Sequence, residues 1–219
     1  MAVWVSPCAS NATDTLNVGP AGRRVTSNFG RFQRAGSGRA SAPGRYWETN
    51  NAESGNRNRR HRGIGGVVAE QLKEKGYRVA AIYGGNDEAA KKYNEETGIA
   101  VYKVDVSDFD AGKNGIAQIE SDLGPVEIIV NNAGITRDST LHRMEQDSWQ
   151  AVIDTNLGSC FNMCRCVIDG IRERKFGRIV NIGSINGQAG QYGQVNYAAA
   201  KSGIHGFTKA LPRELPSTR

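Results

Sequence analysis

At 219 residues, the chain is long enough for one α/β domain with a sizeable core. Its net charge of +6 is confined to one end, because residues 1–62 carry ten Arg and three acidic residues, whereas residues 63–219 carry 18 basic and 19 acidic residues. After residue 62 there is no basic patch interleaved with aromatic residues, and no apolar run could cross a bilayer, so the composition argues against a nucleic-acid partner and against a membrane span.

The N-terminal segment does not have the pattern of a folded domain. Residues 1–50 are rich in Gly, Ser, Arg, Asn and Pro and show no apolar periodicity, which predicts an unstructured extension. The next stretch, residues 51–61, is a row of Asn and Arg. From residue 63 onward the pattern changes abruptly to alternating apolar runs and amphipathic segments.

Those segments predict a doubly wound parallel sheet. Helical spacing predicts helices at residues 66–76, 87–98, 114–124, 144–177 and 195–211. Short apolar runs predict strands at residues 77–85, 99–108, 126–134 and 178–184. Strands that alternate with helices and read as continuous apolar runs imply an α/β fold, with a parallel Rossmann-like sheet covered on both faces in a single domain.

The last predicted helix carries a pair of residues suited to acid–base chemistry. Tyr197 and Lys201 are four residues apart, so both project from one face of the helix. A phenol is a poor acid–base catalyst at neutral pH, because its unperturbed pKa is about 10. A neighbouring ammonium favours the phenolate and moves that pKa toward the working range. A Tyr-x-x-x-Lys pair alone could equally be a chance surface pair.

Polar residues at strand ends strengthen the catalytic interpretation. Ser184 ends a predicted strand, and Asn131 to Gly134 ("NNAG") end the preceding one. Ligands of open α/β sheets bind at the carboxyl ends of the strands. Asn156 is a polar residue within an otherwise apolar helical stretch, and alone it would be read as a solvent-facing residue.

Together these motifs resemble the short-chain dehydrogenase/reductase superfamily over residues 62–211. The resemblance implies that Tyr197 protonates a substrate carbonyl as hydride arrives, while Lys201 lowers the phenol pKa and holds the nicotinamide ribose. It further implies that Ser184 hydrogen-bonds the carbonyl and that Asn156 holds a water in the proton relay. Asp105 would face the adenine. The implied cofactor-binding residues are Tyr197 and Lys201 with Arg62, Gly63, Ile64, Gly65, Asp105, Val106, Asn132, Ala133, Gly134, Ile135 and Thr136.

The expected cofactor is NADPH. The strand at residues 77–85 ends without an acidic residue at its tip to bind a ribose 2′-hydroxyl. The nearest candidate, Asp87, reads better as the N-cap of the next helix. Arg62 could neutralise a 2′-phosphate.

Within the superfamily, the Gln-rich phrase before Tyr197 is most similar to acetoacetyl-CoA reductases of polyhydroxybutyrate synthesis. That resemblance implies a small 3-oxoacyl-CoA substrate contacted by Asp138, Gln191, Tyr192 and Gln194, and a homotetramer when full length. A 3-oxoacyl-(acyl-carrier-protein) reductase is the alternative enzyme, and a non-catalytic nucleotide-binding relative is the alternative of another class.

The Asn- and Arg-rich stretch conflicts with the resemblance. The family has an apolar strand and a "TGGxRGIG" loop where residues 51–61 stand, and unpaired charges cannot be buried in a central strand. Permissible codons for these residues, read one base later, encode "MQRVAIVTGGT". We therefore interpret residues 1–50 as translated upstream sequence, residues 51–61 as frame-shifted, and residues 62–219 as an incomplete reductase domain with a truncated C-terminus and impaired activity. The alternative is a real N-terminal extension with a degenerate glycine loop.

The remaining reactive residues suggest no further site. The four Cys lack metal-ligand spacing, and three of them fall in one helical stretch, where small apolar packing is expected. His61, His142 and His205 have no ligand spacing either, so no metal is expected. Without a signal peptide, a cytoplasmic location is expected by default.

Overall fold

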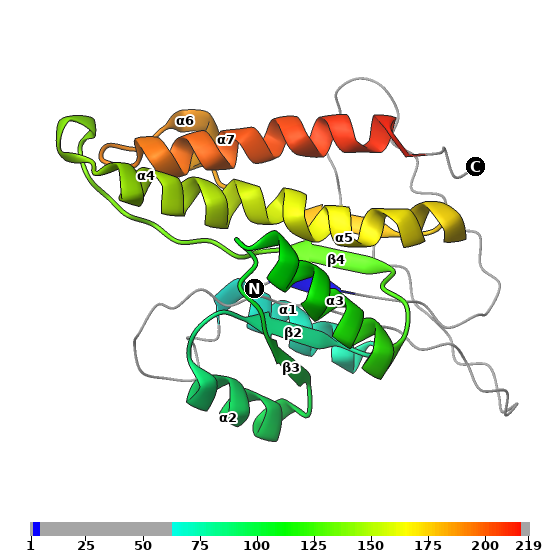
Figure 1. Ribbon diagram of the computed structural model, residues 1–219. Coiled ribbons are helices and arrows are strands. Elements are labelled where there is room, and N and C mark those ends of the chain that lie inside the picture. Colours follow the sequence, from blue (N-terminus) through cyan, green and yellow to red (C-terminus); the bar gives the residue numbers. More distant parts are fainter. Residues whose placement is uncertain (1, 5–62, 216–219) are drawn as a thin grey trace, which may run out of the picture.

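In the computed structural model, the described residues are 2–4 and 63–215 (Figure 1). Their strands form one sheet in the order β3-β2-β1-β4-β5. These strands are β1 (Ala2–Trp4), β2 (Ala80–Tyr83), β3 (Ala100–Lys103), β4 (Ile128–Asn131) and β5 (Arg178–Asn181). The pairs β2–β3 and β4–β5 are parallel, with Ala81 opposite Val101 and Val130 opposite Val180. All four predicted strands are therefore present, each shorter than predicted.

The middle strand departs from the predicted parallel sheet. β1 runs antiparallel to both neighbours, with Val3 opposite Ala81 in β2 and Val130 in β4. The prediction of a wholly parallel sheet is wrong at this strand, since three residues are too few to show the periodicity that predicts a strand. Because β2 and β4 are both antiparallel to β1, β2 to β5 run in one direction and their carboxyl ends share an edge. The rest of the predicted extension, and the segment 51–61, lie outside the described residues.

Helices connect the strands and agree in type with the predicted ones. They are α1 (Gly63–Glu74), α2 (Asp87–Thr97), α3 (Phe109–Leu123), α4 (Gln146–Ile153), α5 (Ser159–Arg174), α6 (Asn186–Ala189) and α7 (Val195–Ala210), with shorter turns η1 (Leu141–Arg143), η2 (Asp154–Gly158) and η3 (Leu211–Arg213). The short α6 was not predicted, and the predicted helix 144–177 divides into α4, η2 and α5. Within residues 63–215, no helix combines the length and the apolar character that a bilayer crossing requires.

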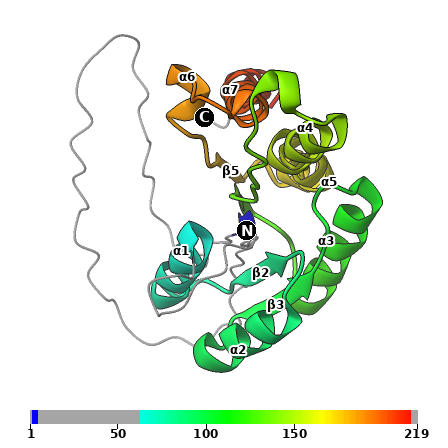
Figure 2. The same cartoon turned by 90° about the vertical axis from the view of Figure 1, so that its left-hand side faces the viewer.

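The core lies between the sheet and helices on both of its faces. Ile82 of β2 and Ile129 of β4 are fully buried. Ala69 of α1 packs against this core from one face, and Ile119 of α3 and Met163 of α5 pack from the other (Figure 2). Burial of these strands from both sides explains why their sequences are continuous apolar runs and not alternating ones.

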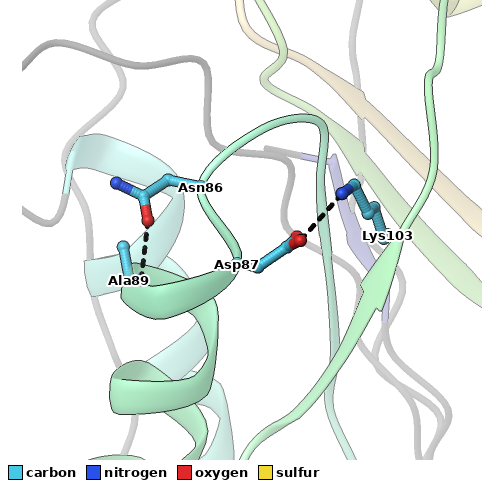
Figure 3. Close-up of polar contacts among 4 residues, drawn as sticks. All are labelled: Asn86, Asp87, Ala89 and Lys103. Carbon is cyan, nitrogen blue, oxygen red and sulfur yellow. Dashed lines mark hydrogen bonds and ion pairs between the residues drawn. The ribbon is translucent and has the colours of Figure 1, made fainter.

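The start of α2 corrects one prediction. Asn86 has extended backbone angles (φ −84°, ψ 97°), and its side-chain oxygen accepts a hydrogen bond from Ala89 N at 2.9 Å (Figure 3). Asn86 is thus the N-cap, because it satisfies an amide that the first helical turn leaves free. The prediction that Asp87 caps this helix is wrong by one residue. The Asp87 carboxylate instead pairs with Lys103 Nζ at 2.9 Å.

Candidate active site

The predicted Tyr–Lys pair lies on α7, which packs against the continuous helical segment formed by α4, η2 and α5 (Figure 1). Lys201 Nζ lies 5.8 Å from the centroid of the Tyr197 ring. Tyr197 is partly buried, whereas Lys201 is only 4% exposed. The burial of Lys201 does not fit a pair of solvated surface residues.

The surroundings of Lys201 hold its ammonium in one place. Nζ donates a hydrogen bond to the carbonyl oxygen of Ile182 at 2.8 Å, just beyond β5. Burial lowers the pKa of Lys201 below its ordinary value of 10.5, and the neighbouring Cys160 opposes this shift. Burial also raises the pKa of the Cys160 thiol to about 11, so this cysteine stays protonated at neutral pH. Lys201 thus has a buried amino group whose orientation is fixed by its hydrogen bond to Ile182.

The lowered pKa of Lys201 predicts a pH-dependent stability. Between the folded-state pKa and 10.5, the unfolded chain binds more protons than the folded chain, so rising pH through that window stabilises the folded state. Relative to Lys201→Met, the wild-type free energy of unfolding should therefore rise toward pH 10.5, by about 1.4 kcal/mol for each unit of pKa difference. Urea unfolding at a series of pH values measures this. The exposed Lys209, changed to Met, is the matched control, and an equal pH trend in both variants would contradict the assignment.

Asn156 lies in η2, a π-helical turn in which Ser159 N donates to Asp154 O. The residue is fully buried, and Nδ2 donates to the carbonyl oxygens of Val152 (2.8 Å) and Ile135 (2.9 Å). Its Oδ1 is buried without a hydrogen-bond partner among the described residues. The reading of Asn156 as a solvent-facing residue is therefore wrong, because its amide is buried and donates to two main-chain carbonyls.

A glycine brings Asn156 and Lys201 into one site. A Cβ on Gly134, in the segment after β4, would lie 2.6 Å from Asn156 Oδ1 and 3.8 Å from Lys201 Nζ. A side chain there would overlap the Asn156 amide, so glycine allows this backbone segment to lie directly against a buried acceptor, with the Lys201 amino group close by. A free buried acceptor is costly unless a bound group or water donates to it.

Ser184 lies at the same edge of the sheet, after β5. Its Oγ accepts a hydrogen bond from Asn186 N at 3.2 Å, at the start of α6. Gly187 of α6 lies against α7 so closely that a Cβ would come within 2.7 Å of the Lys201 backbone. The loop that carries Ser184 is therefore fixed directly against the helical turn that carries Lys201.

Two of the four predicted substrate residues contact each other, and the other two are exposed. Gln194 Nε2 donates to Asp138 Oδ2 at 2.8 Å, which joins the segment after β4 to the start of α7. Gln191 is exposed, and Tyr192 is 87% exposed. The structure thus brings Asp138 and Gln194 together, while Gln191 and Tyr192 project from the surface beside them.

The predicted cofactor residues occupy the carboxyl edge of the sheet, apart from Arg62, which lies outside the described residues. Asp105 follows β3 and accepts hydrogen bonds from Ser107 N (2.9 Å) and Ser107 Oγ (2.6 Å). The main-chain oxygen of Val106 accepts from Asn162 Nδ2 at 3.0 Å, a contact that sequence reasoning missed. Asn132, Ala133, Gly134, Ile135 and Thr136 follow β4, and Gly63, Ile64 and Gly65 open α1.

Comparison with known proteins identifies the family of this chain. A family model described as short chain dehydrogenase matches residues 60–219. The acetoacetyl-CoA reductase of Shinella zoogloeoides is 60% identical over 153 residues, which cover 70% of this chain and 64% of that protein. The acetoacetyl-CoA reductase of Rhizobium meliloti (strain 1021) is 59% identical with the same coverage. The 3-oxoacyl-(acyl-carrier-protein) reductase of Chlamydia muridarum (strain MoPn / Nigg) is 46% identical over 162 residues, 71% of this chain and 65% of that protein. The chain spans slightly less than two thirds of the length of these relatives.

Proposed function

Because the chain belongs to the short-chain dehydrogenase family, as its motifs predicted, we propose that it reduces the 3-oxo group of an acyl thioester with NADPH. The substrate that we propose is acetoacetyl-CoA, reduced to 3-hydroxybutyryl-CoA in polyhydroxybutyrate synthesis. One observation carries the proposal: a buried Lys201 ammonium held 5.8 Å from the Tyr197 ring centroid at the carboxyl edge of the sheet.

The residues of the site suit a nicotinamide ribose. Lys201 Nζ is a donor, Asn156 Oδ1 is a buried acceptor without a partner among the described residues, and both lie beside Gly134. A ribose hydroxyl accepts hydrogen bonds, so it could accept one from Lys201 Nζ. When bound, NADPH supplies a hydride to the C3 carbonyl carbon of the substrate.

The side chains would supply the proton and hold the carbonyl. Tyr197 Oη gives its proton to the carbonyl oxygen as the carbon accepts the hydride, so the ketone becomes a 3-hydroxyl and the phenol a phenolate. Lys201 stabilises that phenolate through its positive charge. The Ser184 hydroxyl donates a hydrogen bond to the same carbonyl oxygen and orients it, and Asn156 holds a water through which the phenolate is reprotonated.

Oxidation of NADPH tests this function. Mixing the protein with NADPH and acetoacetyl-CoA should lower the absorbance at the nicotinamide band, and the acyl-carrier-protein ester should react more slowly. A faster reaction of the carrier-protein ester would favour the alternative reductase, whose named relative is 46% identical. Binding of NADPH without oxidation would favour a non-catalytic nucleotide-binding protein.

The preference for NADPH rests on the end of β2. Asp87 lies beyond Asn86, and its carboxylate is already paired with Lys103 (Figure 3). A hydrogen bond from Lys103 holds the pKa of Asp87 below its ordinary value. A carboxylate occupied in this way is a poor partner for a ribose 2′-hydroxyl.

Changing Asp87 to Asn should therefore leave cofactor choice almost intact. We expect the ratio of NADPH to NADH affinity to change less than about twofold, with little change in stability because the ion pair is exposed. Fluorescence titrations with both cofactors measure the ratio. Asn86→Ala is the control for damage to the helix start, with an expected loss of about 1 kcal/mol. A large loss of NADH binding in the Asp87 variant would show that Asp87 binds the ribose 2′-hydroxyl.

A further inference from the structure

A chain of side-chain hydrogen bonds joins three segments around the proposed active site. Gln194, at the N-cap position of α7, donates from Nε2 to Asp138 Oδ2 at 2.8 Å. Its Oε1 accepts from Asn186 Nδ2 at 2.9 Å, on the first residue of α6. Beside it, Ser139 N donates to Gly193 O at 2.8 Å. The segment after β4, α6 and the start of α7 are therefore tied together at one residue.

A carboxamide can make this pair of contacts because one side chain carries both a donor and an acceptor. The Asp138 carboxylate can only accept hydrogen bonds, and Asn186 turns the donor group of its amide, Nδ2, toward Gln194. The residue between them must present a donor to Asp138 and an acceptor to Asn186. Gln194 does both, and its side chain makes no cap hydrogen bond to its own helix.

The chain of contacts ends on the hydroxyl of Ser184. The main-chain N–H of Asn186 donates to Ser184 Oγ at 3.2 Å, which occupies one lone pair of the hydroxyl. A hydroxyl has one proton to donate and two lone pairs to accept with. When one lone pair is engaged by Asn186, the proton of Ser184 is available for a substrate carbonyl.

We propose that Gln194 is a positioning residue that holds Ser184 in its reactive orientation through Asn186, with Asp138 as the anchor. This inference rests on the proposed function, and it replaces the expected role of Gln194 as a simple substrate contact. A substrate contact would set the KM for acetoacetyl-CoA. A positioning residue sets kcat, because it acts on the geometry of the reacting group.

The variant Gln194→Glu tests the proposal. It keeps an acceptor for Asn186 but places a carboxylate against that of Asp138, so kcat should fall at least about tenfold while KM stays within about twofold. The double variant Asp138→Asn with Gln194→Glu restores a donor opposite a carboxylate, with the two roles exchanged, and it should regain most of the lost kcat. Gln188→Glu adds the same charge at an exposed position of α6 and is the matched control.

Two results would overturn the proposal: a raised KM with unchanged kcat in Gln194→Glu, or a double variant no more active than that single variant. Melting temperature gives a readout that does not need turnover, because the double variant should melt at a higher temperature than Gln194→Glu alone. If the wild-type protein fails to oxidise NADPH, the proposed function fails. The melting temperatures of the single and double variants then test the contact between Gln194 and Asp138. Additive effects of the two substitutions on melting temperature would reject that contact.

Discussion

Replacing Tyr197 with Phe should lower kcat for acetoacetyl-CoA reduction by about a thousandfold, because the phenolic proton donor is removed while the ring remains. The contact between the Lys201 ammonium and the ring face at 5.8 Å should persist, since it does not use the hydroxyl. NADPH affinity should therefore change little. Stopped-flow NADPH oxidation and a fluorescence titration on the same preparation separate the two effects.

Tyr102→Phe is the matched control for loss of a tyrosine hydroxyl. Tyr102 Oη donates to Asp122 Oδ2 at 3.1 Å, between β3 and α3 and away from the proposed site. Burial, with the hydrogen bond to Asp122, raises the pKa of Tyr102 to about 12, so this phenol takes no part in proton transfer at neutral pH. Its loss should leave kcat unchanged and cost about 1 kcal/mol of stability. A Tyr197→Phe variant that keeps a tenth or more of wild-type turnover would reject the assigned proton donor.

Restoring an apolar strand and glycine loop before α1 should raise NADPH affinity about a hundredfold. We propose that residues 51–61 stand where the peptide "MQRVAIVTGGT" belongs, immediately before Arg62 and Gly63. In the structure, the position between β2 and β4 is held by the three-residue antiparallel β1. A parallel strand in that position would lead its chain directly into the N-terminus of α1 at the carboxyl edge.

The gain would come from backbone groups. Small residues before α1 let a phosphate approach the free N–H groups of the first helical turn, and each charge-assisted hydrogen bond contributes about 1.5–3 kcal/mol. Two such bonds at the lower end of this range contribute about 3 kcal/mol, which corresponds to roughly a hundredfold gain. The apolar residues of the peptide would also bury surface between β2 and β4 and raise the melting temperature.

Fluorescence titration of NADPH compares the original chain, the chain with the replaced segment, and a chain with the same eleven residues in scrambled order. Equal affinities for the replaced and scrambled segments would count against a phosphate-binding role. Resequencing the gene tests the origin of the segment separately. The reading-frame hypothesis requires one additional base immediately before the Arg62 codon, so a gene sequence without that base would reject it, whatever the affinity.

The sequence by itself determined the framework and the identity of the proposed catalytic residues. Apolar runs marked β2 to β5 because a strand buried on both faces needs a continuous apolar surface, as Ile82 and Ile129 illustrate. The four-residue spacing of Tyr197 and Lys201 placed both on one face of α7, since helical geometry is local. Ser184 was placed at the carboxyl edge by its position after a strand.

Only the tertiary structure decided which polar groups meet. Gln194 and Asp138 are 56 positions apart, and Asn162 reaches Val106 across 56 positions. Asn156 is buried within a π-helical turn, and β1 pairs antiparallel with β2 and β4, neither of which follows from local periodicity. Local periodicity records which side of an element is buried, but hydrogen-bond partners are chosen by packing between distant segments, so no spacing in the chain encodes them.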